Sequence, residues 1–109
     1  MKNIIISEIL DKNNTLMGYK TNGLDKISSK ELVIKIPLDR LTAEYILNTI
    51  ADEIKKGVSI KDNDTNNSIL NCVIYFKEID NEIRIIFPDV KMKYPWDEEC
   101  DKKYKQQIA

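Results

Sequence analysis

Apolar positions follow two patterns along this chain, a helical spacing and short continuous runs, and the two patterns predict two kinds of element. From residue 43 to residue 54 they recur every three or four positions, the spacing of one face of an α-helix. The stripe consists of Ala43, Ile46, Leu47, Ile50, Ala51 and Ile54. We predict that this stripe, with Ile50 at its middle, faces a sheet, because burying its four largest side chains contributes about 6 to 12 kcal/mol that an isolated helix lacks.

The residues that flank this stripe predict where the helix begins and ends. Asp39 and Thr42 are both candidate N-caps, because either side chain can accept a hydrogen bond from an N–H group of the first turn. Lys55 and Lys56 suit the negative C-terminal end of the helix dipole, and Gly57 suits the left-handed residue that ends many helices.

Short β-branched and apolar runs on either side of the helix predict strands. Asp80 and Asn81 separate two of these runs and tolerate the positive φ of a two-residue hairpin turn. Expected strands are residues 4–10, 15–21, 31–36, 69–79 and 82–87, with a short segment at 58–60 as an optional strand and with loops at 24–30 and 61–68. We therefore expect one α+β domain over residues 1–109: an antiparallel sheet of about five strands with one main helix on one face, in the order β-β-β-α-(β)-β-β.

Composition favours a soluble globular protein and narrows its chemistry. Of the 109 residues 42% are hydrophobic and 32% charged, and 17 basic residues against 18 acidic ones give a net charge of -1. This balance disfavours nucleic acid and anionic membranes as partners, and no apolar run reaches the roughly 18 residues of a membrane span. The absence of histidine excludes serine–histidine and cysteine–histidine catalysis and favours a non-enzymatic protein.

The remaining candidate motifs do not predict a metal or a cofactor. Residues 62–66 begin like a calcium-binding loop, but Asn67 replaces the required glycine and Val73 stands where a glutamate is needed. Cys72 and Cys100 have no CxxC spacing and no histidine co-ligands, so we expect two reduced thiols rather than a zinc site. Because the start of the chain lacks a secretory h-region, we expect a cytoplasmic protein.

From Pro88 onward the chain changes character and carries its only tryptophan. We expect residues 88–109 to form an irregular lid in which Asp89 holds a turn through bonds to the backbone. Trp96 is expected to be mostly buried against the sheet, beside Tyr94 or Tyr104, because indole side chains bury a large area. Candidate binding residues are Asp89, Tyr94, Trp96 and Asp97, with the two carboxylates at the rim of the binding surface.

The motif Phe87-Pro88-Asp89, followed by Tyr94-Pro95-Trp96-Asp97 and later by Gln106-Gln107, resembles the closing motif of a bacterial family known as domain of unknown function 4262. Residues 19–24, 31–34 and 47–57 are similar to earlier parts of that family. The chain departs from the family where Val90-Lys91-Met92 occupies a turn that usually carries glycine, and where Ser29-Lys30 replaces a frequent histidine. The family has no established activity, so the resemblance implies no mechanism.

Two functional hypotheses follow. We favour a small non-enzymatic interaction protein, monomeric or homodimeric, whose partner is another protein. Ile, Lys and Asn, whose codons are AT-rich, are abundant, and there are only two arginines, whose codons are largely GC-rich. This composition suggests a bacterial or prophage genome that is AT-rich, where the protein could neutralise a toxin or defence component. The alternative is a small-ligand-binding protein or small enzyme using Asp89, Tyr94, Trp96 and Asp97. A deep pocket beside Trp96 would favour the ligand, and an exposed apolar patch would favour the protein partner.

Overall fold

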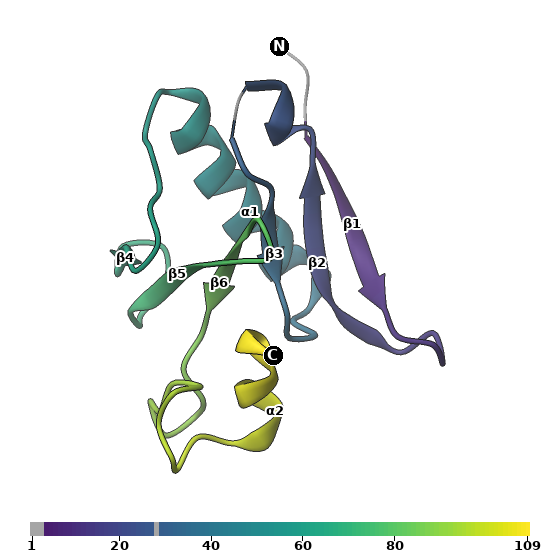
Figure 1. Ribbon diagram of the computed structural model, residues 1–109, viewed down its shortest axis with the longest axis vertical. Coiled ribbons are helices and arrows are strands. Elements are labelled where there is room, and N and C mark those ends of the chain that lie inside the picture. The colour runs from purple at the N-terminus through teal and green to yellow at the C-terminus, as the bar shows by residue number, and fades with distance from the viewer. Residues whose placement is uncertain (1–3, 28) are drawn as a thin grey trace.

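Six strands form one mixed sheet, and the main helix lies across one of its faces (Figure 1). The computed structural model describes residues 4–27 and 29–109. In chain order the elements are β1 (Ile5–Leu10), β2 (Leu16–Asn22), the 3₁₀ helix η1 (Leu24–Ile27), β3 (Leu32–Ile34), α1 (Arg40–Lys55), β4 (Thr65–Asn66), β5 (Ile74–Ile79), β6 (Glu82–Ile86), α2 (Lys102–Lys105) and η2 (Gln106–Ile108). The spatial order of the strands is β1-β2-β3-β6-β5-β4.

The predicted α+β class and the single main helix are confirmed, but the sheet is not purely antiparallel and has six strands rather than about five. Strands β3 and β6 are parallel neighbours, with Leu32 opposite Ile83 and Val33 opposite Arg84. The parallel pair arises because the chain leaves β3, crosses one face of the sheet as α1 and returns through the β5–β6 hairpin with β6 innermost. A helical crossover is the type of connection that parallel neighbours require.

The apolar stripe of α1 forms the core with one face of the sheet, as predicted. Ile46 and Leu47 are fully buried and Ile50 is 2% exposed. The strands contribute Ile34, Ile74 and Ile85 to the same cluster. The predicted orientation of Ile50 is therefore confirmed.

Both ends of α1 follow from single residues. Asp39 is the N-cap, and its Oδ2 accepts a hydrogen bond from the N–H of Thr42 at 3.0 Å. The helix ends at Lys55, and Gly57 adopts the left-handed conformation with φ 101°. Of the two candidate caps, the structure selects Asp39.

The loops contain more structure than the sequence indicates. The first expected loop contains η1, and the optional strand lies at Thr65–Asn66 rather than at residues 58–60. Strand β5 begins at Ile74 rather than at residue 69, whereas the hairpin turn is as predicted, with positive φ at Asp80 and Asn81. The displaced strand β4 exists because Thr65 and Asn66 pair with Tyr75 and Ile74 of β5, which follow them in the chain.

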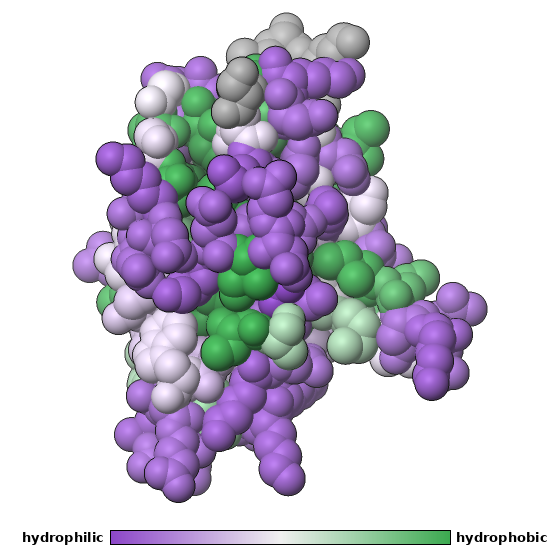
Figure 2. All heavy atoms as spheres, in the orientation of Figure 1, coloured by the Kyte–Doolittle hydropathy of each residue, from purple (hydrophilic) through white to green (hydrophobic). Residues whose placement is uncertain are grey.

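The two outer edges of the sheet differ. Beside β5, the N–H of Asn63 donates to the carbonyl of Phe76, the carbonyl of Asp64 accepts from Phe76, and the side chain of Asp62 accepts from the N–H of Glu78. At the other edge, no strand of the described residues pairs with the outer side of β1. Figure 2 shows hydrophobic side chains exposed over the β1–β2 hairpin. Residues 62–66 thus cover the outer side of β5, whereas among the described residues the outer side of β1 is open.

The C-terminal segment, residues 88–109, lies against the sheet face opposite α1. It continues past the end of β6 and turns back toward β3 and β6 (Figure 1). Arg84, which alternates with the core-facing Ile83 and Ile85, donates from Nη1 to the carbonyls of Gln107 at 3.0 Å and Ala109 at 2.6 Å. This placement brings the predicted binding residues to the second face of the sheet.

Candidate functional site

Asp89 organises the backbone of the C-terminal segment. Its Oδ1 accepts hydrogen bonds from the N–H groups of Lys91 and Lys93, and its Oδ2 accepts one from Asp101, each at 2.9 Å. The bonds from Asp101 and Lys93 are the main reason that the pKa of Asp89 lies below its usual value. The predicted bonds to the backbone are confirmed, but Asp89 is only 5% exposed, so its predicted place at the rim of a binding surface is wrong.

Asp97 also closes a turn. Its Oδ2 accepts from the N–H of Tyr94 at 2.8 Å, and its own N–H donates to the carbonyl of Tyr94 at 2.8 Å. The side chain is half-buried. This pair of bonds fixes the Tyr94–Asp97 turn and so determines where the two aromatic side chains of the turn point.

Tyr94 and Trp96 form a cluster with Tyr75 of β5. The rings of Tyr94 and Trp96 are stacked, with centroids 5.3 Å apart and an interplanar angle of 5°. Tyr75 meets both rings edge-on, at 5.0 Å from Tyr94 and 4.9 Å from Trp96. Offset and edge-on arrangements of this kind each contribute about 0.5 to 1.5 kcal/mol beyond area burial. Tyr94 is therefore the close neighbour of Trp96 that the sequence predicted.

Trp96 itself is 46% exposed, so the prediction that it is mostly buried is wrong. Tyr94 takes the inner position, where its hydroxyl donates to the carbonyl of Val73 at 2.6 Å. The indole of Trp96 stacks on the outer side of Tyr94, with one part of its surface in solvent. Trp96 is thus held in one orientation by its neighbours while remaining accessible.

Lys77 completes this surface. Its Nζ lies 5.9 Å from the centroid of the Trp96 ring and also donates to the side-chain oxygen of Asn63. We call Tyr75, Lys77, Tyr94 and Trp96 the aromatic surface. Tyr75 and Lys77 were not among the site residues predicted from the sequence. Their alternation with the buried Ile74 and Phe76 along β5 is the signal that places them on the face opposite α1.

The two cysteines are free. Burial raises the pKa of both Cys72 and Cys100, and for Cys100 the nearby Asp89 raises it further. A raised pKa keeps a thiol protonated and weakly nucleophilic. Within residues 4–27 and 29–109 no group of three or more Cys, Asp or Glu side chains is arranged to hold a metal ion, and no helix is long and apolar enough to cross a membrane.

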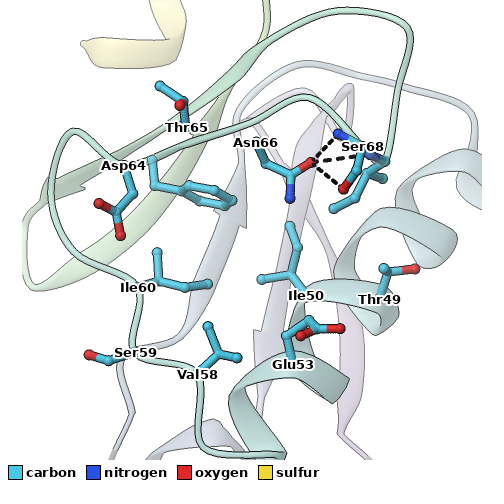
Figure 3. Close-up of a pocket in the computed structure, with 12 residues that line it drawn as sticks. Thr49, Ile50, Glu53, Val58, Ser59, Ile60, Asp64, Thr65, Asn66 and Ser68 are labelled. Atoms are coloured by element: carbon cyan, nitrogen blue, oxygen red, sulfur yellow. Dashed lines mark hydrogen bonds between the residues drawn. The ribbon is translucent and has the colours of Figure 1, made fainter.

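One cavity lies beside α1 and away from the aromatic surface. It has a volume of about 510 Å³ and lies between the C-terminal half of α1, residues 58–60 and residues 64–69 (Figure 3). Ile50 and Phe76 contribute to its apolar wall, and Glu53 and Asp64 are its acidic residues. Neither this cavity nor the two others described, near residues 20–31 and 54–60, is lined by any of the four predicted binding residues.

Comparisons with family models, with curated proteins and with solved structures found no match to this chain. The resemblance of the C-terminal motif to domain of unknown function 4262 therefore stays a prediction.

Proposed function

We propose that this protein is a non-enzymatic interaction protein that binds another protein through its aromatic surface. The observation that carries the proposal is the indole of Trp96, which is 46% exposed yet packed against Tyr75 and Tyr94. A large side chain that is already ordered loses little conformational entropy on binding, and tryptophan and tyrosine are enriched among the residues that dominate binding energy at interfaces.

A protein partner accounts for this surface better than an enclosed ligand. One neighbour of the Trp96 ring is the stacked Tyr94, and Lys77 lies over the ring, so the exposed part of the indole is presented as part of an open surface. The carboxylates of Asp89 and Asp97 accept hydrogen bonds from the backbone rather than converging on a cavity. This use of the two carboxylates supports a binding role over acid–base catalysis by them.

Affinity capture with matched variants tests the proposal. The immobilised wild-type chain is incubated with lysate of the native host beside Trp96→Ala and the control Val90→Ala, whose side chain is 90% exposed in the same segment. We expect wild type and the control to retain the same protein, and Trp96→Ala to lose most of it. Equal retention by all three chains would contradict the proposal.

A second variant separates binding from folding. Lys77→Glu reverses the charge beside Trp96 without removing an aromatic ring, and circular dichroism with a thermal melt establishes that each variant is folded. We expect folded Lys77→Glu to retain less partner than wild type. If folded Lys77→Glu and folded Trp96→Ala both bind normally, the partner uses another surface.

A further inference from the structure

The cavity beside α1 has an apolar wall and a polar side chain whose orientation is fixed by the loop that carries it. The oxygen of the Asn66 amide accepts hydrogen bonds from the N–H of Ser68 at 2.9 Å, from the N–H of Ile69 at 3.1 Å and from the Ser68 hydroxyl at 3.3 Å. Rotating the amide by 180° would put a donor against two backbone donors. Asn66 must therefore keep its oxygen on the loop and its Nδ2 group on the opposite side.

The Nδ2 group of Asn66 is directed into the cavity. Figure 3 shows it on the side of Asn66 that faces Ile50, away from the three bonds to Ser68 and Ile69. Among the described residues it donates no hydrogen bond, and it is accessible to solvent rather than buried. The cavity thus offers a ligand one fixed hydrogen-bond donor above an apolar wall, and the group suits an acceptor such as a carbonyl oxygen.

The charges of the cavity are of one sign. Its lining includes the carboxylates of Glu53 and Asp64 and no lysine or arginine. In Figure 3 these two side chains lie on opposite sides of the apolar residues. Asp64 uses Oδ2 to accept from the N–H of Lys61 at 2.8 Å, whereas the carboxylate of Glu53, at an exposed position, has no hydrogen-bond or ion-pair partner among the described residues. An organic cation would find a complementary charge here.

From these features we propose that the cavity binds a small organic ammonium compound that has an apolar body and a carbonyl group. The ammonium would lie near Glu53, the body would contact Ile50, Ile60 and Phe76, and the carbonyl would accept from Nδ2 of Asn66. The volume of about 510 Å³ falls within the range of small-molecule sites, about 300 to 1,000 Å³. A bare metal ion fits less well, because the atom that Asn66 directs inward is a donor.

Three probes that share an acetamide group and a five-carbon alkyl segment test each part of the proposal. N-acetyl-1,5-diaminopentane carries the ammonium, N-pentylacetamide lacks it, and 6-acetamidohexanoate replaces it with a carboxylate. Each is titrated into the full ¹⁵N-labelled chain while amide shifts are followed by NMR. We expect saturable shifts around Ile50, Ile60 and Asn66 with the diamine derivative, about fivefold weaker binding of N-pentylacetamide and no saturation by the hexanoate. Equal binding of the three probes, shifts elsewhere, or no saturation by the diamine derivative up to about 20 mM would overturn the proposal.

Matched variants locate the two polar contacts. Glu53→Gln should weaken the diamine derivative about fivefold, to the level of N-pentylacetamide, whereas Asp52→Asn, which alters an exposed neighbour outside the cavity, should leave the affinity unchanged. Asn66→Asp keeps an oxygen for the bonds to Ser68 and Ile69 but removes the donor, so it should abolish binding of N-pentylacetamide. Unchanged affinities in Glu53→Gln and Asn66→Asp would overturn the assignment.

Discussion

One residue of the C-terminal segment, Met92, has a strained backbone conformation that the hydrogen bonds of the segment hold in place. Met92 has a φ of 62°, in the left-handed region that costs a residue with a side chain about 1 to 2 kcal/mol. The turn persists because Asp89 accepts from two of its N–H groups and because the N–H of Met92 donates to the carbonyl of Asp89 at 2.9 Å. A glycine at position 92 would adopt this conformation without a Cβ clash.

Met92→Gly should therefore stabilise the protein, by about 0.5 to 1 kcal/mol after the greater flexibility of glycine in the unfolded chain is subtracted. Met92 is 54% exposed, so little packing is lost. Urea denaturation midpoints measure the change. Val90→Gly, at an exposed position without a positive φ, is the control and should lower the midpoint. A lower midpoint for Met92→Gly would show that the turn does not hold position 92 under strain.

At the scale of elements, patterns within short stretches of sequence were sufficient to predict α1 and the β5–β6 turn. The stripe around Ile50 and the positive φ at Asp80 and Asn81 depend on neighbours within a few residues. The position of β4 was not predictable, because it exists through pairing of Asn66 with Ile74. The parallel pairing of β3 with β6 depends on which strand of the β5–β6 hairpin lies next to β3. The exposure of Trp96 depends on its packing against Tyr94 and against Tyr75 of β5.

Substitutions in α1 test the face that packs on the sheet. Ile50→Ala should lower the free energy of unfolding by about 2 to 5 kcal/mol, because it removes buried methyl groups and leaves a cavity. Asp52→Ala, on the exposed face, should change it by no more than about 0.5 kcal/mol. Chemical denaturation gives both values. Similar midpoints for the two variants would mean that another face of the helix is buried.

Glu31 links β3 to the start of η1. Although burial raises the pKa of Glu31, hydrogen bonds from the Thr21 hydroxyl and from the N–H groups of residues 23–25 outweigh it and hold the pKa below its usual value. A carboxylate whose pKa is lower in the folded than in the unfolded state stabilises the fold above its unfolded pKa, and this stabilisation is lost as the pH falls through the folded value.

Glu31→Gln should therefore be less stable than wild type at pH 7, and the difference should narrow as the pH falls below about 4.3, the usual pKa of glutamate. Thermal melts between pH 7 and pH 3 follow the difference. Glu98→Gln, at an exposed glutamate, serves as the control and should track wild type throughout. A Glu31→Gln difference that stays constant over this range would show that the bonds do not depend on the charge of Glu31.

At the scale of the molecule, α1 and the C-terminal segment cover opposite faces of the sheet by different means. The α1 side is an apolar core, whereas the C-terminal segment is attached by hydrogen bonds from Arg84 and Gln107 as well as by the contacts of Tyr94 and Trp96 with Tyr75. Gln107 is fully buried, and its side chain accepts from the N–H of Phe87 and donates to the carbonyl of Phe87, both at 2.8 Å. One amide side chain thus pairs with the backbone just after β6 as a neighbouring strand would.

Because the C-terminal segment is attached to the face opposite the α1 core, we predict that this segment detaches from the sheet before the core unfolds. Gln107→Met preserves much of the side-chain length but leaves two buried backbone groups of Phe87 without partners, at a cost of about 1 to 3 kcal/mol each. Hydrogen exchange should accelerate at residues 101–109 while the amides of α1 stay protected. Gln106→Met, at a half-buried neighbour, should leave both regions protected.

Gln107→Met also tests whether the attachment of the C-terminal segment keeps the aromatic surface in place. If residues 88–109 open together, Trp96 loses its packing on Tyr75, and its fluorescence should shift to longer wavelength in Gln107→Met before the α1 core unfolds. Partner capture should then weaken even though Gln107 is not itself exposed. Equal acceleration of exchange in α1 and in residues 101–109 would instead mean that both faces of the sheet unfold as one cooperative unit.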